Sequence, residues 1–213
     1  MTMRRVAITI AFLGFATSAG ACSNVESGTP SAHDSAAPSG TTSPAMAIPQ
    51  QLDLQSYTSD PCALLPEQLL SSLRYAPEGD VTLPGDESFS QEVAGMSGPY
   101  CGWKSEEGAA RTLTLTLLTS EFTQGEDVFS RARELHSQGA LTLWEELDVS
   151  EYPAAYWGIQ DNRQRGDCAL LVAVSDQDFL AVSADMYLEE PESACLDVES
   201  VTKSAIDNLR EGS

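Results

Sequence analysis

The sequence is poor in basic side chains. It has 11 Lys and Arg residues against 32 Asp and Glu residues among its 213, which gives a formal net charge of -21 at pH 7. A surface this acidic repels nucleic acid and anionic lipid headgroups, so we expect neither as a partner. No EF-hand pattern of Asp and Asn with its Gly and terminal Glu is present either. The acidity therefore indicates a soluble extracytoplasmic domain rather than a calcium-binding one.

Histidine and catalytic motifs are scarce as well. The chain has His33 and His136, and it contains no G-x-S-x-G, H-E-x-x-H or P-loop motif. A zinc site is disfavoured because there is no C-x-x-C spacing and both histidines lie far from the cysteines. We therefore expect no catalytic residues, no metal and no cofactor. A cell-wall hydrolase with paired carboxylates remains an alternative, because close acidic pairs are common among so many Asp and Glu.

Long apolar runs are limited to the N-terminus. The segment from Val6 to Phe15 is apolar but too short to cross a bilayer. Arg4 and Arg5 precede it and the small residues Ala16 to Ala21 follow it, which is the order of a secretory signal peptide. We expect residues 1–21 to be that signal peptide.

Cys22 directly follows the small residues, as the lipidated cysteine of a bacterial lipobox does. Ala19 stands where a lipobox normally has Leu, and Ala19-Gly20-Ala21 also fits the A-x-A rule of ordinary secretion. Both interpretations place the cut before Cys22. We favour lipidation, in which palmitate-type chains, at about 0.8 kcal/mol per buried methylene, hold the protein on the extracytoplasmic face of the cell membrane. Without the lipid, the protein is secreted.

The other four cysteines are an even set in an oxidising compartment, which indicates two disulfides. They are Cys62, Cys101, Cys168 and Cys195, and they allow three pairings. We favour Cys62 with Cys101 and Cys168 with Cys195, because each pair links neighbouring elements and closes a modest loop.

The mature chain divides into a linker and a domain. Residues 22–57 are rich in Ser, Thr, Ala and Pro and have almost no aromatic side chains, so we expect a disordered linker. Residues 58–213 have the length of a single domain.

Hydrophobic periodicity predicts the elements of this domain. Thr and Leu alternate over residues 111–117, as in a half-buried strand with its leucines inward, and we expect a hairpin with the segment that begins at Tyr100. Further strands are expected at residues 89–93, 141–149, 154–159, 168–174 and 179–186, and helices at residues 65–73, 126–139 and 192–210. These elements predict an α+β domain in which a mainly antiparallel sheet is packed by helices on one face.

Two polar features have structural interpretations. His136 lies near the end of the expected helix 126–139, where it favours the helix C-terminus. Asp176 and Asp178 lie between two expected strands, where they fit an ordinary turn better than a metal site.

Aromatic residues cluster in one part of the chain, at Trp144, Tyr152, Tyr156 and Trp157. Aromatic residues on strands usually belong to the core, but in a concavity they bind apolar or sugar ligands. We keep Trp144, Tyr156 and Trp157 as candidate ligand-binding residues.

Several short motifs are similar to those of one family. They are Asp60-Pro61-Cys62 with Leu64-Leu65-Pro66-Glu67, Cys101-Gly102-Trp103 after a Gly-rich loop, Asp167-Cys168 before an apolar strand, and Cys195 in a C-terminal helix. Over about residues 60–209 the chain resembles the actinobacterial lipoprotein family known as domain-of-unknown-function family 3558. The resemblance implies an exported, usually lipidated protein and supplies neither an activity nor catalytic residues. Similar surface lipoproteins lead us to expect a fold like those of Mog1 and the photosystem subunit PsbP.

The sequence thus predicts a non-catalytic binding or accessory module at the cell envelope, with an envelope protein or a small ligand as its partner. The alternatives are a carrier that holds an apolar or sugar ligand in an aromatic cleft and the cell-wall hydrolase named above.

Overall fold

The computed structural model describes residues 47–86, 97–105 and 110–212, and all of them fall within the unit Ser43–Ser213. Cys22, the expected signal peptide and the strand expected at residues 89–93 lie outside the described residues. No helix in the described part of the chain has the length and apolar character needed to cross a membrane.

The predicted strands and helices within the described residues follow one another in the expected order, whereas the short strand at residues 80–82 and the short helix at residues 120–123 were not predicted. The strands are β1 (Asp80–Thr82), β2 (Tyr100–Lys104), β3 (Thr112–Leu118), β4 (Leu143–Val149), β5 (Tyr152–Gly158), β6 (Cys168–Ala173) and β7 (Phe179–Asp185). The α-helices are α1 (Glu67–Ser72), α2 (Ser120–Thr123), α3 (Val128–Ser137) and α4 (Pro191–Glu211), and the 3-10 helices are η1 (Gln55–Tyr57), η2 (Pro61–Leu64) and η3 (Arg163–Arg165).

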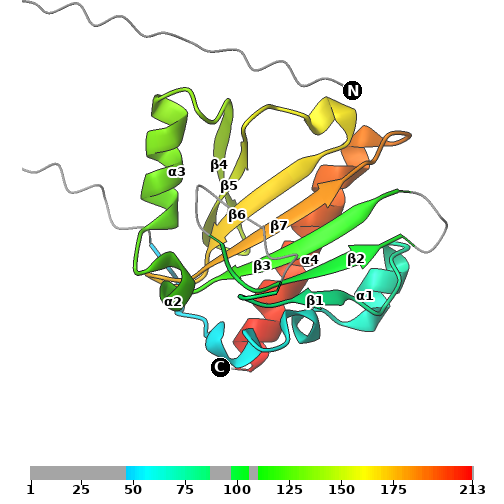
Figure 1. Cartoon of the computed structure of the whole chain (residues 1–213), viewed down its shortest axis with the longest axis horizontal. Coiled ribbons are helices and arrows are strands. Elements are labelled where there is room, and N and C mark those ends of the chain that lie inside the picture. The colour runs from blue at the N-terminus through cyan, green and yellow to red at the C-terminus, as the bar shows by residue number, and fades with distance from the viewer. Residues whose placement is uncertain (1–46, 87–96, 106–109, 213) are drawn as a thin grey trace, which may run out of the picture. The chain divides into compact units, whose positions relative to one another are not determined.

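The seven strands of the described residues form one antiparallel sheet in the order β1-β2-β3-β7-β6-β5-β4 (Figure 1). The hairpins expected for β2 with β3 and for β6 with β7 are confirmed. The central pairing joins two distant segments, because Leu115 of β3 lies opposite Val182 of β7. The predicted α+β class with a mainly antiparallel sheet is thereby confirmed.

The alternation within each strand produces two hydrophobic clusters on opposite faces of the sheet. Leu113, Leu115 and Leu117 of β3 belong to the larger cluster, which also contains the apolar face of α4. The smaller cluster contains Phe129 of α3, whose ring stacks on Phe179 of β7 at 5.9 Å. We expected helices on one face of the sheet, and α4 covers the face with the larger cluster. The opposite face is covered in part by α3, three of whose residues are buried in the smaller cluster.

The folded domain begins earlier than the sequence suggested. Residues 47–57, which we placed in the linker, belong to the domain. Leu52 and Leu54 are buried in the larger cluster, and the backbone N–H of Leu52 donates to the carbonyl oxygen of Val174 at 3.0 Å. The polar composition around these two leucines concealed the hydrophobic contact that orders the segment.

Two disulfides connect the elements in the pairing that we favoured. Cys62 of η2 is bonded to Cys101 of β2, and Cys168 of β6 is bonded to Cys195 of α4, with Cα atoms 5.1 and 5.2 Å apart. Each bond therefore fastens a helical element to the sheet.

Candidate functional site

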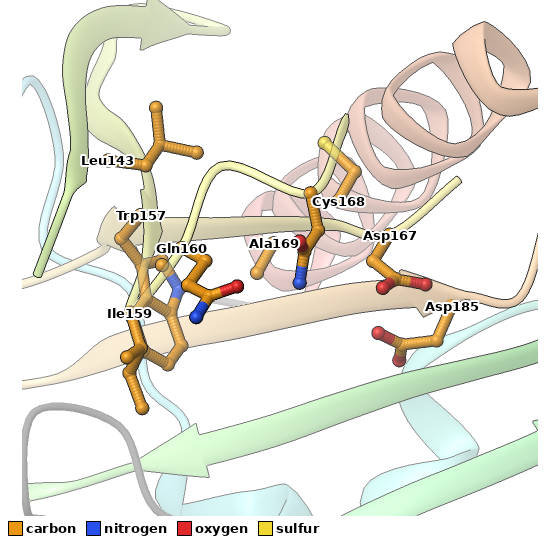
Figure 2. A pocket seen from close by; sticks show the side chains of 10 residues that line it. Leu143, Trp157, Ile159, Gln160, Asp167, Cys168, Ala169 and Asp185 are labelled. Carbon is orange, nitrogen blue, oxygen red and sulfur yellow. The ribbon is translucent and has the colours of Figure 1, made fainter. Parts of the chain in front are cut away.

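A pocket of about 360 Å³ lies where β5 and β7 end and β6 begins (Figure 2). We call it the Trp157 pocket. Its lining combines an indole, aliphatic groups, two amides and two carboxylates, from Leu143, Trp157, Gly158, Ile159, Gln160, Asn162, Asp167, Cys168, Ala169 and Asp185. Its volume is within the range of small-molecule sites, about 300 to 1,000 Å³.

The register of the β6–β7 hairpin brings the two carboxylates together. Cys168 lies opposite Ala184, so the next residue outward on each strand, Asp167 and Asp185, comes to the same edge. Figure 2 shows their carboxylates pointing toward one another. Oδ1 of Asp167 accepts a hydrogen bond from the backbone N–H of Met186 at 3.0 Å, and Oγ of Ser183 donates to Oδ2 of Asp185 at 3.3 Å.

Neither carboxylate has a basic partner. Among the described residues, Asp167 and Asp185 form no ion pair with Lys or Arg. Burial raises the pKa of Asp185, and the neighbouring charge of Asp167 raises that pKa further, against a smaller lowering by the Ser183 hydrogen bond. The pocket thus carries negative charge that its lining does not neutralise.

The opposite side of the pocket is apolar. Leu143, Trp157 and Ile159 lie on this side in Figure 2, and Asp167 and Asp185 lie on the other. Leu143 is buried, whereas Ile159 is 70% exposed. Within the described chain, the buried Nε1 of Trp157 has no hydrogen-bond partner. An indole beside aliphatic side chains is suited to an apolar or aromatic ligand body.

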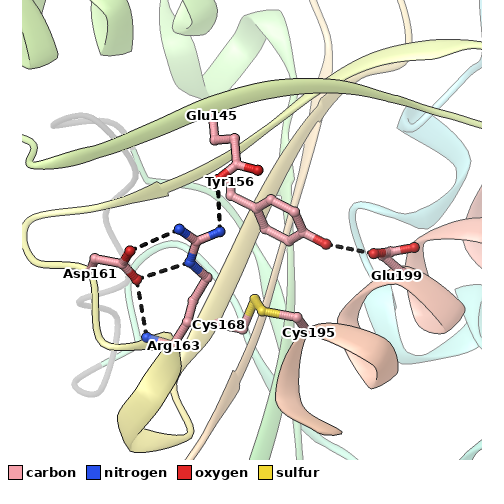
Figure 3. Close-up of a disulfide and its surroundings, with 7 residues drawn as sticks. All are labelled: Glu145, Tyr156, Asp161, Arg163, Cys168, Cys195 and Glu199. Atoms are coloured by element: carbon pink, nitrogen blue, oxygen red, sulfur yellow. Dashed lines mark hydrogen bonds and ion pairs between the residues drawn. A yellow bond between two sulfur atoms is a disulfide. The ribbon is translucent and has the colours of Figure 1, made fainter. Parts of the chain in front are cut away.

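A clamp around Arg163 fixes the segment between β5 and β6 that supplies Gln160 and Asn162 to the pocket (Figure 3). Arg163 donates to both carboxylate oxygens of Asp161, at 2.9 and 2.8 Å, and from Nη1 to Oε2 of Glu145 on β4 at 2.9 Å. These hydrogen bonds raise the pKa of Arg163 and lower the pKa of Asp161.

Cys168, which lines the pocket, is bonded to Cys195, and this disulfide joins β6 to α4 (Figure 3). Beside it, the hydroxyl of Tyr156 donates to Oε1 of Glu199 at 2.6 Å, which ties β5 to the same helix. This hydrogen bond, followed by the contact with Lys203, lowers the pKa of Glu199. The pocket is therefore framed by covalent and polar contacts within the protein.

The structure separates the three aromatic candidates. Trp157 lines the pocket. Trp144 is its cross-strand neighbour on β4, but its ring packs edge-on against Phe129 at 5.4 Å and its indole N–H donates to Glu146 at 2.7 Å. Tyr156 points instead toward α4 (Figure 3).

His136 and Asp178 make hydrogen bonds within the fold, in keeping with the structural roles expected for them. Nδ1–H of His136 donates to the carbonyl oxygen of Leu141 at 2.9 Å, just beyond the end of α3. Asp178 lies in the β6–β7 turn, where its backbone N–H donates to Oγ of Ser175 and its carboxylate accepts from the backbone N–H of Ser120. Among the described residues, no three His, Cys, Asp or Glu side chains are grouped closely enough to hold a metal ion.

A second cavity of about 250 Å³ is lined in part by Arg74, Arg111 and Tyr187. The hydroxyls of the buried Tyr75 and Tyr187 are hydrogen-bonded to one another, and Tyr187 donates to Oδ2 of Asp197 at 2.5 Å. Burial raises the pKa of Tyr75 to about 12 and raises the pKa of Asp197 despite the Tyr187 hydrogen bond. This chain of side chains ties the segment after α1 to α4, which is a structural role.

Sequence inspection missed four polar residues of the pocket: Gln160, Asn162, Asp167 and Asp185. The predicted hairpin held a signal for two of them. Once the turn is centred on residues 175–178, Asp167 and Asp185 must flank the open end of the hairpin. Gln160 and Asn162 lie in an irregular segment, and hydrophobic periodicity does not predict the conformation of such a segment.

The matching family spans the pocket. The model of the family described as Protein of unknown function (DUF3558) matches residues 18–208. The chain belongs to this family. The resemblance inferred from the cysteine motifs is thereby confirmed, and every residue of the Trp157 pocket lies within the matched range. No curated protein and no solved structure matches the DUF3558 chain, so the likeness to Mog1 and PsbP stays a prediction.

Proposed function

We propose that this DUF3558 protein is a lipid-anchored, extracytoplasmic module that binds a small ligand in the Trp157 pocket without transforming it. The observation that carries the proposal is the pocket of about 360 Å³ with an indole wall opposite two carboxylates. Small-ligand sites typically combine a concavity of this size with apolar lining and a few polar groups that fix orientation.

The frame of the pocket supports binding. Arg163, the Cys168–Cys195 disulfide and the Tyr156–Glu199 hydrogen bond hold the surrounding segments in place. A site that is already ordered loses little conformational entropy when it binds, so more of the contact energy appears as affinity.

The sequence and the disulfides support the extracytoplasmic location. The signal-peptide pattern ends directly before Cys22, and two disulfides are compatible with an oxidising compartment. Lipid on Cys22 holds the domain at the membrane surface, so the ligand is one that is met in the cell envelope.

The carboxylate pair favours one second candidate, a cell-wall hydrolase. A raised pKa on Asp185 beside Asp167 resembles the acid and base pairing of glycosidases. We rank it second because Oδ1 of Asp167 already accepts the Met186 backbone N–H, which leaves it less free to act on a substrate. Release of reducing sugar ends from peptidoglycan, abolished by Asp185→Asn, would establish the hydrolase; we expect none.

A fragment screen by ligand-observed NMR tests the binding proposal on the mature chain from residue 22 onward. We expect fragments that bind the native protein and Trp144→Leu but not Trp157→Leu, because only the second substitution removes a pocket wall. Trp144 is a matched control, since the two indoles are cross-strand neighbours. Thermal unfolding of both variants checks folding. If Trp157→Leu keeps its fragments, or if the native protein binds none, the proposal is wrong.

A further inference from the structure

The chemistry of the Trp157 pocket identifies the class of its ligand. We propose that it binds an amphipathic organic cation, a primary amine whose ammonium lies between Asp167 and Asp185 and whose apolar body lies against Trp157. This inference rests on the proposed function, because it names the ligand of the same pocket.

Charge is the first argument. Two of the ten lining residues are acidic and none is Lys, Arg or His. No described basic side chain forms an ion pair with either carboxylate. Phosphates, carboxylates and acidic sugars are therefore repelled from the pocket, whereas a cation finds charge that the protein has left uncompensated.

The facing arrangement of the two carboxylates is the second argument. They point toward one another across one end of the pocket (Figure 2). The burial of Asp185 and the mutual repulsion of the two groups raise the pKa of that residue, which means that ionising both carboxyl groups is unfavourable. One ammonium between them replaces this repulsion with two charge-assisted hydrogen bonds, which are about twice as strong as neutral ones.

The apolar wall determines the rest of the ligand. Trp157, Leu143 and Ile159 lie across the pocket from the carboxylates (Figure 2). An indole beside aliphatic side chains binds the apolar body of a ligand. The arrangement fits a molecule with a charged head and an apolar body, and a volume of about 360 Å³ accepts a small molecule rather than a folded partner.

A metal ion fits the pocket poorly. Calcium takes 6 to 8 oxygen ligands and magnesium demands an octahedral set. The described residues offer no group of three acidic, His or Cys side chains, and one oxygen of Asp167 is already engaged by Met186. The indole and aliphatic wall supplies no ligand to a metal, but it does supply contacts to an organic cation.

Calorimetric titration of the mature chain with phenethylamine and with phenethyl alcohol tests the inference. The two probes share one body and differ in charge. At pH 7 and low salt we expect the amine to bind at least about tenfold more tightly, which corresponds to roughly 1.4 kcal/mol. Asp185→Asn should weaken amine binding and so remove this preference. Asp176→Asn is the matched control, because Asp176 is exposed in the turn at the far end of the same hairpin.

The outcomes separate this inference from the proposed function. Equal binding of the two probes, or an amine preference that survives Asp185→Asn, overturns the ammonium site. If phenethylamine fails to bind while a neutral sugar or other fragment binds in a Trp157-dependent way, the ligand class is wrong and the binding function stands. If nothing binds at Trp157, both are wrong. Thermal unfolding of Asp185→Asn excludes misfolding as the cause of any loss.

Discussion

Nη1 of Arg163 donates a hydrogen bond of 2.9 Å to Oε2 of Glu145, which joins the segment lining the Trp157 pocket to the edge strand β4. The same guanidinium holds Asp161 with two hydrogen bonds and lies 5.6 Å from the ring centre of Tyr156. Arg163 therefore anchors the segment between β5 and β6, whose regular structure is limited to the short helix η3.

Arg163→Leu should loosen the rim of the pocket. Glu145 and Asp161 are partly exposed, so we expect a loss of only about 1 kcal/mol in unfolding free energy, but faster amide exchange over residues 158–167. Hydrogen exchange with mass spectrometry measures the change. Arg163→Lys, which keeps the charge and loses the planar fork, should fall between native and Leu.

The matched control for this substitution is Arg131→Leu, which removes an exposed pair with Glu134 on α3. It should leave exchange at residues 158–167 unchanged. If Arg163→Leu does not alter that exchange either, the clamp does not order the segment.

Asp185→Asn should stabilise the domain at neutral pH. The folded-state pKa of Asp185 is raised, so the folded state binds its proton more tightly than the unfolded chain does. The stability linked to this proton is present below the unfolded pKa and is lost as the pH rises through the folded pKa. An amide cannot ionise, so the variant escapes that loss and is also free of the repulsion from Asp167. We expect an increase of a few degrees in melting temperature at pH 7, which corresponds to about 1 kcal/mol in a protein of this size.

Melting temperatures of the native and variant proteins from pH 3 to pH 8 measure this effect. The difference should shrink toward the acid end, where the native carboxyl is protonated. A variant that is less stable at pH 7 would show that Asp185 serves the fold. A difference that does not depend on pH would show that the ionisation of Asp185 is not its cause. A gain in stability combined with loss of amine binding would instead show that the fold tolerates this carboxylate for the sake of binding.

The sequence was most informative where one physical constraint acts locally. Alternation of Thr and Leu over residues 111–117 predicted β3 because a strand places successive side chains on opposite faces. The disulfide pairing was predictable because each pair closes a loop between neighbouring elements.

It was least informative where distant segments meet. Nothing in the local pattern places β7 beside β3, where Leu115 lies opposite Val182, since that contact depends on how two hairpins share one core. Leu52 and Leu54 were assigned to the linker for the same reason: their partners lie far away in the chain, with Leu52 bonded to Val174. The pocket combines both cases, because a hairpin register positions Asp167 and Asp185 while an irregular segment supplies the amides.

The two disulfides should differ in their effect on the pocket. Cys168→Ala with Cys195→Ala removes the bond that joins β6 to α4, and Cys62→Ala with Cys101→Ala removes one that joins η2 to β2. The sequence separations are 27 and 39, so the chain-entropy model gives each a loss of about 3.5 to 4 kcal/mol in unfolding free energy. Denaturant titrations should therefore show similar losses.

Ligand affinity should fall further in the variant that lacks Cys168 and Cys195, because Cys168 itself lines the pocket. Equal affinities in both variants would contradict a framing role for the Cys168–Cys195 bond.

Cys22 should carry the membrane anchor. Intact mass spectrometry of the protein purified from its native membrane is expected to show acyl chains on the N-terminal residue. Full reduction should add the mass of four hydrogens, because two disulfides are broken. Cys22→Ser should move the protein from the membrane to the soluble fraction, because two acyl chains contribute about 0.8 kcal/mol per buried methylene and no helix among the described residues could cross a membrane in their place. The pocket lies in residues 143–185, so Cys22→Ser should bind phenethylamine as the native protein does. An unmodified Cys22 on a membrane-associated protein would show that another contact holds the domain there, and an unmodified Cys22 on a released protein would place the pocket in the medium rather than at the membrane surface.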